Sequence, residues 1–307
     1  MQSPKYNLNP NINWWHLSMN TEAIDLLEAN QDKIDWMSLS YNSNIDALQL
    51  LFRNPTHIYW DWLSLNTNPQ AIKMLKANPS KICWYGLSQN TNYEAIQILK
   101  ANPSKICWCG LSKNSGAIQI LSENLDKIDW DNLSKNSGAI ELLKANPDKI
   151  NWYYLSQNPG AIRLLEANPD KIEWSHLSVN SKAIYLLSLN PDKINWTNLS
   201  LNTGAIQLIS ENLDKIDWSI LSGNTGAIHL ITESLRLNKN LDEIDWRRLS
   251  TNPNAMSILA PLDYSTMKAT WKPFCKELVE YVLHPLRIGR ISLNHGLDVE
   301  EYLEQVF

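Results

Sequence analysis

The sequence lacks the long apolar segments and the cysteine content typical of membrane or secreted proteins. No run approaches the roughly 18 consecutive apolar residues that a membrane-spanning helix needs, and the polar N-terminus, Met1 to Tyr6, lacks the apolar core of a secretory signal. Four cysteines in 307 residues are too few for a disulfide framework. We therefore expect an intracellular protein that is neither secreted nor membrane-bound.

Motifs for catalysis and for nucleic-acid binding are also missing. The sequence contains no glycine-rich phosphate loop, paired-carboxylate motif or nucleophile motif. The net charge of −5 disfavours a nucleic-acid partner, which usually requires a basic surface. The sequence thus predicts a non-enzyme without cofactor, metal or small-molecule substrate. Any new catalytic group would be confined to the tail, at His284, Arg287, Arg290 and His295.

What the sequence has in abundance is a repeat. Residues 128–136, Ile-Asp-Trp-Asp-Asn-Leu-Ser-Lys-Asn, recur with small changes in eleven copies, and every copy continues from Trp to Leu-Ser-x-Asn at the same offset. Six of the ten Trp-to-Trp intervals are 22 residues, three are 24 and the last is 28. Such self-similarity indicates a repeat array. The repeat tryptophans are Trp14, Trp36, Trp60, Trp84, Trp108, Trp130, Trp152, Trp174, Trp196, Trp218 and Trp246.

Each unit reads best as two short helices, A and B. Asn or Asp precedes the Trp in seven copies, as expected for a residue that caps a helix N-terminus. Helix A would then run from about Trp130 to Lys135 in the copy that begins at Asp129. Helix B would carry the Ala-Ile-x-Leu-Leu stretch, which has helical spacing, and end near the next Asn. Two extra residues between Leu-Ser-x-Asn and Ala-Ile, in the 24-residue intervals, are expected in a loop, whereas the 28-residue interval would lengthen one helix B.

A competing interpretation makes Lys-Ile-x-Trp a short strand, as in a leucine-rich-repeat horseshoe of similar unit length. That strand would be only three or four residues long, and the leucine ladder of those repeats is absent. We therefore predict an all-α solenoid of eleven two-helix repeats over residues 1–260. Because an open array exposes its last face, residues 261–307, which leave the repeat pattern, are expected to form a helical C-terminal cap.

The repeat Asn-Pro-Asp-Lys-Ile-x-Trp-x-x-Leu-Ser-x-Asn-x-x-Ala-Ile-x-Leu-Leu resembles the short Trp- and Asn-rich repeats, about 22 residues long, of giant-virus proteins from the mimivirus-like DNA viruses of amoebae. The segment Phe274-Cys275-Lys276-Glu277-Leu278, with His284 to Arg290, is similar to the closing segment of such proteins. The resemblance covers nearly the whole chain. It implies a virus-encoded repeat protein that acts on host partners or sits in the virus particle.

The invariant positions allow structural and functional interpretations. Eleven tryptophans could form a stacking platform for bases or sugars, but a structural layer is favoured because a binding platform rarely needs so many equivalent copies. The Ser and Asn of Leu-Ser-x-Asn are expected to be buried, as an asparagine ladder that satisfies backbone groups. Lys before the Ile in eight copies usually follows an Asp, which predicts a solvated face with local ion pairs. Cys83 and Cys107 occupy the capping slot, with Cys109 nearby, and are expected to be free thiols.

Function, if the repeat carries any, is expected at the two variable residues after each Trp. These slots hold residues from Gly to Trp, so they are unlikely core positions, and exposed aromatic and Arg side chains are typical anchors of protein interfaces. Drift of an exposed face is the other interpretation. We predict a scaffold for a protein or peptide partner, or else a structural component of a virus particle. The candidate contacts are Trp15, Trp62, Tyr85, Tyr153, Tyr154 and Arg248.

Overall fold

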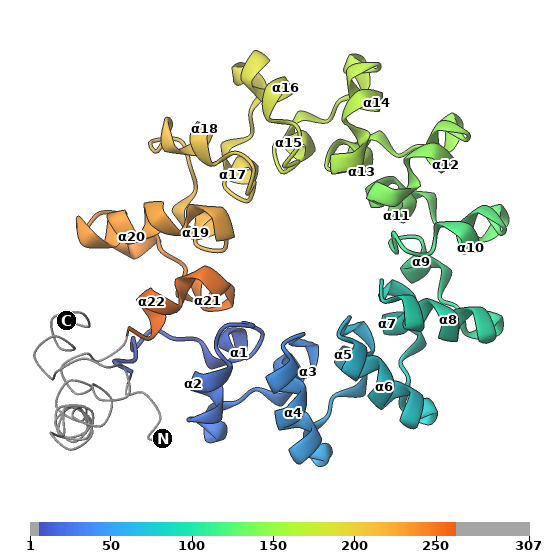
Figure 1. Ribbon diagram of the computed structural model, residues 1–307. Helices are drawn as coiled ribbons and strands as arrows, with labels where there is room; N and C mark the ends of the chain where they lie inside the picture. Colours follow the sequence, from blue (N-terminus) through green and yellow to red (C-terminus); the bar gives the residue numbers. More distant parts are fainter. Residues whose placement is uncertain (1–5, 262–307) are drawn as a thin grey trace, which may run out of the picture. The chain divides into compact units, whose positions relative to one another are not determined.

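The computed structural model describes residues 6–261, which are entirely helical in their regular structure (Figure 1). Every repeat contributes two short helices, and neighbouring repeats pack side by side, so the predicted all-α repeat array is confirmed. No β-strand occurs among the described residues, which rules out the horseshoe interpretation for this part of the chain.

The eleven A helices each begin at the repeat Trp. They are α1 (Trp14–Leu17), α3 (Trp36–Tyr41), α5 (Trp60–Leu65), α7 (Trp84–Gln89), α9 (Trp108–Leu111), α11 (Trp130–Lys135), α13 (Trp152–Ser156), α15 (Trp174–Leu177), α17 (Trp196–Leu199), α19 (Trp218–Leu221) and α21 (Trp246–Thr251).

The eleven B helices alternate with them along the chain. They are α2 (Ile24–Glu28), α4 (Ile45–Arg53), α6 (Pro69–Ala77), α8 (Tyr93–Ala101), α10 (Ile118–Ser122), α12 (Ile140–Lys144), α14 (Ile162–Glu166), α16 (Ile184–Leu189), α18 (Ile206–Ser210), α20 (Ile228–Arg236) and α22 (Met256–Leu259).

Short 3₁₀ turns complete the units. Between repeats they are η1 (Gln31–Lys33), η2 (Pro55–His57), η3 (Pro79–Lys81), η4 (Pro103–Lys105), η5 (Leu125–Lys127), η7 (Pro147–Lys149), η9 (Pro169–Lys171), η10 (Pro191–Lys193) and η12 (Leu241–Glu243). Within repeats they are η6 (Ser137–Ala139), η8 (Pro159–Ala161), η11 (Thr225–Ala227) and η13 (Pro253–Ala255).

Helix A begins where the sequence predicts, because its capping residue works as expected. In all seven copies with Asn or Asp before the Trp, that side chain accepts a hydrogen bond from a backbone N–H of the first turn. The four other copies, with Tyr59, Cys83, Cys107 and Glu173 in this slot, have no side-chain cap. Their helices still form, so packing between repeats rather than capping decides the fold.

The two-residue insertions of the early repeats lie in helix B and not in a loop, which corrects the prediction. In α4, α6 and α8 the extra residues give a regular first turn, capped by Asn44, Asn68 and Asn92. Repeats without the insertion begin helix B later, often after a 3₁₀ turn such as η6. The six-residue insertion lengthens α20, as expected.

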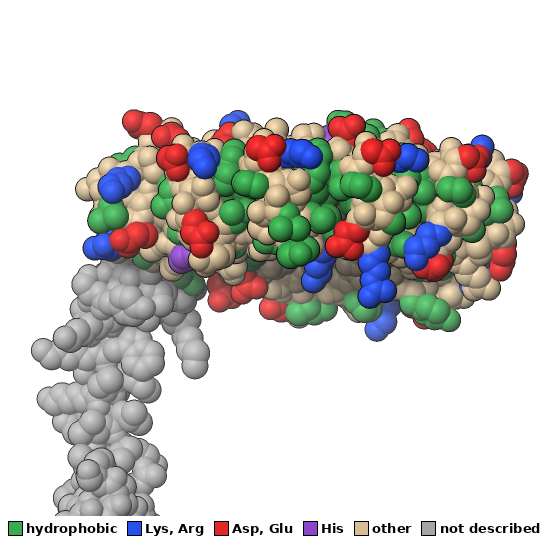
Figure 2. Space-filling view, turned by 90° about the horizontal axis from the view of Figure 1, so that it is seen from above, with side chains coloured by type: hydrophobic (Ala, Val, Ile, Leu, Met, Phe, Trp, Pro, Cys, Tyr) green, Lys and Arg blue, Asp and Glu red, His purple; other side chains and the backbone are tan. Residues whose placement is uncertain are grey.

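Residues 10–259 close into a ring, with the A helices inside and the B helices outside (Figure 1). The first A helix, α1, packs against the last, α21. We call this contact between the last and first repeats the seam. Seen edge-on, the ring is a flat band whose outer wall carries interspersed acidic and basic side chains (Figure 2).

Closure removes the reason for expecting a cap. An open solenoid leaves its last repeat exposed, whereas here the last repeat packs on the first. The predicted cap itself, at 261–307, lies almost wholly outside the described residues. Within residues 6–261, no helix is long and apolar enough to cross a membrane.

Candidate binding surface

The invariant Ser of each repeat joins two consecutive repeats. Its Oγ donates to the carbonyl of the repeat Trp four residues earlier, at 2.7–2.9 Å. The same Oγ accepts from the backbone N–H before the Trp of the next repeat, at 3.0–3.1 Å. At the seam, Ser250 accepts from Asn13 at 3.0 Å in the same way. All eleven junctions of the ring therefore carry this bond.

The invariant Asn forms the expected ladder. Each Asn is at most 3% exposed, and its Nδ2 donates to backbone carbonyls of the preceding repeat, at the Ser, the Asn or both. Its Oδ1 accepts from the backbone N–H two residues later. Asn20 continues the ladder across the seam, donating to Ser250 O at 3.2 Å and Asn252 O at 3.0 Å.

The repeat tryptophans are a structural layer, but most are only partly buried. Ten are intermediate in exposure and one, Trp218, is buried. A lysine of the following repeat lies over the indole in five copies, with Nζ 4.5–4.9 Å from the ring centroid, as for Lys33 over Trp14. The predicted Asp–Lys pairs are mostly absent among the described ion pairs, where only Lys149–Asp148 is of this kind. The lysines instead cover aromatic faces, an interaction that stabilises more once the ring is partly desolvated.

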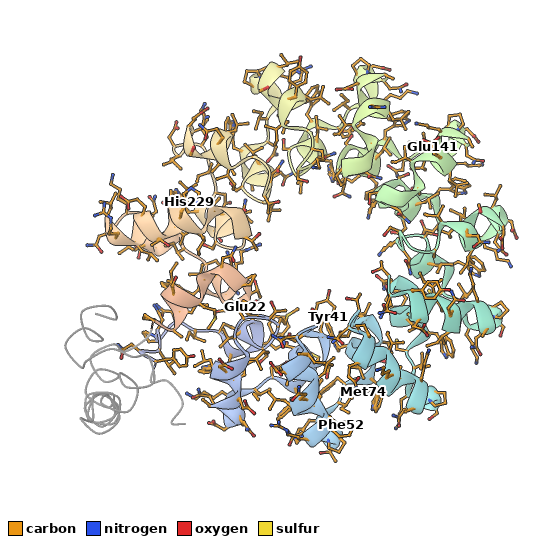
Figure 3. All side chains as sticks on the ribbon, viewed as in Figure 1. Glu22, Tyr41, Phe52, Met74, Glu141 and His229 are labelled. Atoms are coloured by element: carbon orange, nitrogen blue, oxygen red, sulfur yellow. The ribbon has the colours of Figure 1, made fainter. Side chains whose placement is uncertain are left out.

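The variable residues gather on the inner wall of the ring. In helix A, Leu and Ser at the third and fourth positions after the Trp are fully buried. The first, second and fifth positions lie on the opposite side of the helix because each residue advances about 100°. We call these the inner-wall positions. Figure 3 places Tyr41, at a fifth position, on the inner edge and Phe52, on α4, at the outer edge.

The six predicted contact residues all occupy inner-wall positions. Trp15 is 41% exposed, Tyr85 51% and Tyr153 49%, each at the first position. Arg248 is exposed, while Trp62 and Tyr154 are only partly exposed. The structure thus distributes them around the whole inner wall rather than in one patch, except for the adjacent pair Tyr153 and Tyr154, whose ring centroids are 5.1 Å apart.

The expectation that both variable slots lie outside the core is wrong for three of the eleven copies of the second slot. Ser38, Gly86 and Gly110 are buried there, because this side chain packs against helix A of the preceding repeat. A Cβ on Gly86 would lie 3.1 Å from the carbonyl oxygen of Asp61, so α5 and α7 approach closely at this point. Where the second slot holds one of these small residues, it is a packing position between repeats.

The fifth position was missed as part of the surface. Its residue, the x of Leu-Ser-x-Asn, contacts the second position of the next repeat: Tyr41 packs edge-on against Trp62 with centroids 5.9 Å apart, and Lys135 Nζ lies 3.6 Å from the Tyr154 centroid. Its variability, together with its spacing of three and four residues from the other two slots, is the sequence feature that could have identified it.

One stretch of the inner wall forms a continuous aromatic and cationic cluster. Lys135, Tyr154, Tyr153 and His176 are linked in sequence by ring contacts, the last between Tyr153 and His176 at 3.7 Å. We call these four residues the tyrosine cluster. It spans three consecutive repeats.

Two hollows lie elsewhere on the ring. A polar one of about 750 Å³ lies beside α21, where Asp245 is paired with Arg247 and Arg248. Burial raises the pKa of Asp245, but hydrogen bonds from both arginines outweigh it and hold this pKa below its ordinary value. An apolar groove of about 360 Å³, between α4 and α6, is lined by Ile45 and Phe52 among others. No group of three potential metal ligands occurs among residues 6–261.

Fold and surface together define a closed ring of α-helical repeats with a variable inner wall. Searches of protein-family models, curated proteins and solved structures gave no match.

Proposed function

We propose that the protein is a non-enzymatic scaffold that binds a protein or peptide at the inner wall of its ring. The observation that carries this proposal is a division of labour within the repeat. The invariant Leu, Ser and Asn are buried and used between or within repeats, whereas the inner-wall positions hold residues as different as Gly, Trp, Asp and Arg. The requirements of the fold explain the invariant Leu, Ser and Asn. They do not explain the diversity of the inner-wall residues.

The side chains on the inner wall suit a protein partner. Exposed Trp and Tyr offer large contact areas with few rotatable bonds, and such residues dominate the binding energy of many interfaces. In the tyrosine cluster, Lys135 adds a donor and the phenol groups add further hydrogen-bonding atoms. We take this cluster as the principal anchor of the partner.

The size of the ring fits one polypeptide segment. Eleven helices spaced about 8–10 Å apart give a circle roughly 28–35 Å across between helix axes, and subtracting one helix of about 10–12 Å leaves an opening near 20 Å. The centre stays open when side chains are drawn (Figure 3). An extended peptide or a single α-helix, about 10–12 Å wide, passes through such an opening. From the giant-virus resemblance, the partner is a host or viral protein inside the infected cell.

Quantitative capture from amoebal lysate tests the proposal with two matched double variants. The first, Tyr153→Ala with Tyr154→Ala, removes the centre of the tyrosine cluster. The control, Phe52→Ala with Tyr185→Ala, removes two outer-wall aromatics that are 73% and 68% exposed. We expect a captured partner whose affinity falls at least tenfold, about 1.4 kcal/mol, in the first variant and is unchanged in the control. Equal binding by both variants would refute the inner-wall assignment.

The alternative is a structural component of a virus particle, held by lateral contacts of its outer wall. The exposed Phe52, Tyr93 and Tyr185 on that wall favour it. Mass spectrometry of purified particles would exclude this role if the chain is not found there.

A further inference from the structure

Two cysteine thiols meet at the start of α9. The Sγ atoms of Cys107 and Cys109 are 3.1 Å apart. Cys107 is the residue that precedes the repeat Trp, and Cys109 is the first residue after it. Cys109 is exposed and Cys107 is partly exposed, so reagents in solution reach the pair.

Neither thiol makes the hydrogen bonds that cap helix A or join the repeats. In seven other repeats the residue at the Cys107 position caps helix A with its side chain, whereas Cys107 makes no such bond. Its backbone N–H still donates to Ser88 Oγ, so the junction does not depend on the thiol. The preceding repeat provides an internal comparison, since Cys83 occupies the same slot but Tyr85 stands where a second thiol would be needed.

The contact also affects the reactivity of Cys109. The hydrogen bond with Cys107, followed by burial, raises the pKa of Cys109 above its ordinary value. Only the thiolate attacks a disulfide, so reaction near pH 7 is slow and becomes faster at higher pH.

We propose that Cys107 and Cys109 are a reversible oxidation site, at which a low-molecular-weight disulfide such as oxidised glutathione converts the two thiols into one intrachain disulfide. The Cys109 thiolate attacks one glutathione sulfur, forming a mixed disulfide and releasing one glutathione thiolate. The Cys107 thiolate then attacks Cys109 Sγ, forming the Cys107–Cys109 bond and releasing the second glutathione. Two protein thiols are oxidised, one glutathione disulfide is reduced to two thiols, and the two protein protons pass to the products.

The geometry favours ring closure over a lasting mixed disulfide. A disulfide requires the sulfurs to approach to about 2.05 Å, which is roughly 1 Å closer than they lie in the reduced pair. Because Cys109 occupies a first inner-wall position, oxidation changes the chemistry of the candidate binding surface without touching the ladder or the buried Ser bonds.

Glutathione redox buffers and peptide mapping test the site in the full chain. Trypsin cleavage after Lys105 and Lys113 gives the peptide 106–113, which contains Cys107 and Cys109 and no other cysteine. After oxidation, alkylation of remaining thiols and digestion, we expect this peptide to lose two hydrogens and to carry neither glutathione nor alkyl groups. The peptide that contains Cys83 should carry glutathione instead. In Cys107→Ser, Cys109 should retain glutathione as Cys83 does.

Three results would overturn the proposal. Peptide 106–113 could stay reduced in buffers that modify Cys83, it could keep glutathione on the native pair, or its cysteines could instead link to Cys83, Cys275 or a second chain. Unfolding in urea is a further control: because the fold holds the two sulfurs together, the ratio of disulfide to dithiol should fall at least tenfold. An unchanged ratio would show that the folded structure does not create the site.

Discussion

Closure of the ring makes a quantitative prediction about two asparagines of the ladder. Asn180 lies in the middle of the chain and Asn20 lies at the seam, and both are 1% exposed. Asn180 Nδ2 donates to Ser156 O at 3.0 Å and to Asn158 O at 2.9 Å. Its Oδ1 accepts from the backbone N–H of Lys182 at 3.0 Å. Asn20 makes the same three bonds, two of them to residues more than 200 positions away.

Replacing either residue with alanine should therefore cost about the same free energy of unfolding. Three hydrogen bonds at about 0.5–1.5 kcal/mol each give a loss of roughly 1.5–4.5 kcal/mol, because the buried carbonyls and N–H are left without partners. If the ring were open in solution, the Nδ2 of Asn20 would face water. Asn20→Ala would then remove only the bond within its own repeat and cost about 1 kcal/mol.

Urea unfolding followed by circular dichroism measures both values, with Asn168→Ala as the control. Asn168 follows helix B of the preceding repeat and makes a single side-chain bond, to Leu164 O at 2.8 Å, so its loss should be near 1 kcal/mol. Equal midpoints and slopes for Asn20→Ala and Asn180→Ala support closure. Closure would be refuted if Asn20→Ala lowered the free energy of unfolding only as much as Asn168→Ala does, while Asn180→Ala lowered it several-fold more.

Three further predictions concern the junctions and the seam. Ser156→Ala leaves the Glu173 N–H without its acceptor and should cost about 1–3 kcal/mol in urea unfolding, whereas the exposed Ser188→Ala should change stability by less than about 0.5 kcal/mol. Glu173→Asn supplies a missing helix cap and should stabilise by about 1 kcal/mol; a loss of stability would show that the cap cannot form there. Burial lowers the pKa of His16 at the seam below 6.5, with Asp245 opposing and Arg247 adding to this shift. The unfolded state therefore binds the proton more readily, and the free energy of unfolding should fall as the pH drops below about 6.5. His16→Gln should remove this pH dependence.

The local structure followed from the sequence because local chemistry determines it. The Asn or Asp of the capping slot indicated the start of helix A, and the predicted range Trp130 to Lys135 is that of α11. The buried Ser and Asn were predictable because polar residues that recur among apolar ones must find partners. The candidate contact residues were predicted to be exposed because their slots vary between repeats, and none of the six is buried, although the same second slot is buried at Ser38, Gly86 and Gly110.

The sequence did not predict the ring, because curvature depends on a small rotation at each junction. Eleven equal rotations close a circle at about 33° each, and a few degrees either way would give an open superhelix. The lysine partners were missed for a related reason. Lys33 follows an Asp in the sequence, yet across the junction it meets Trp14, and such a neighbour depends on how repeats stack. The assignment of the insertions to loops was wrong because extra residues can also extend a helix. In α4 they do so where Asn44 caps the added turn.

The sequence did contain one trace of closure, in its first and last copies. Terminal repeats of an open array expose a face that is otherwise buried, so they usually exchange apolar residues for polar ones there. Here the first and last copies keep the consensus, and Leu17, Ala23, Leu249 and Ala255 are fully buried like their equivalents inside the array. Apolar residues at both ends of a solenoid would be costly in water unless the two ends cover each other. The unchanged terminal copies therefore required either a cap or a ring, and the bonds from Asn13 and Asn20 across the seam show that the chain uses the ring.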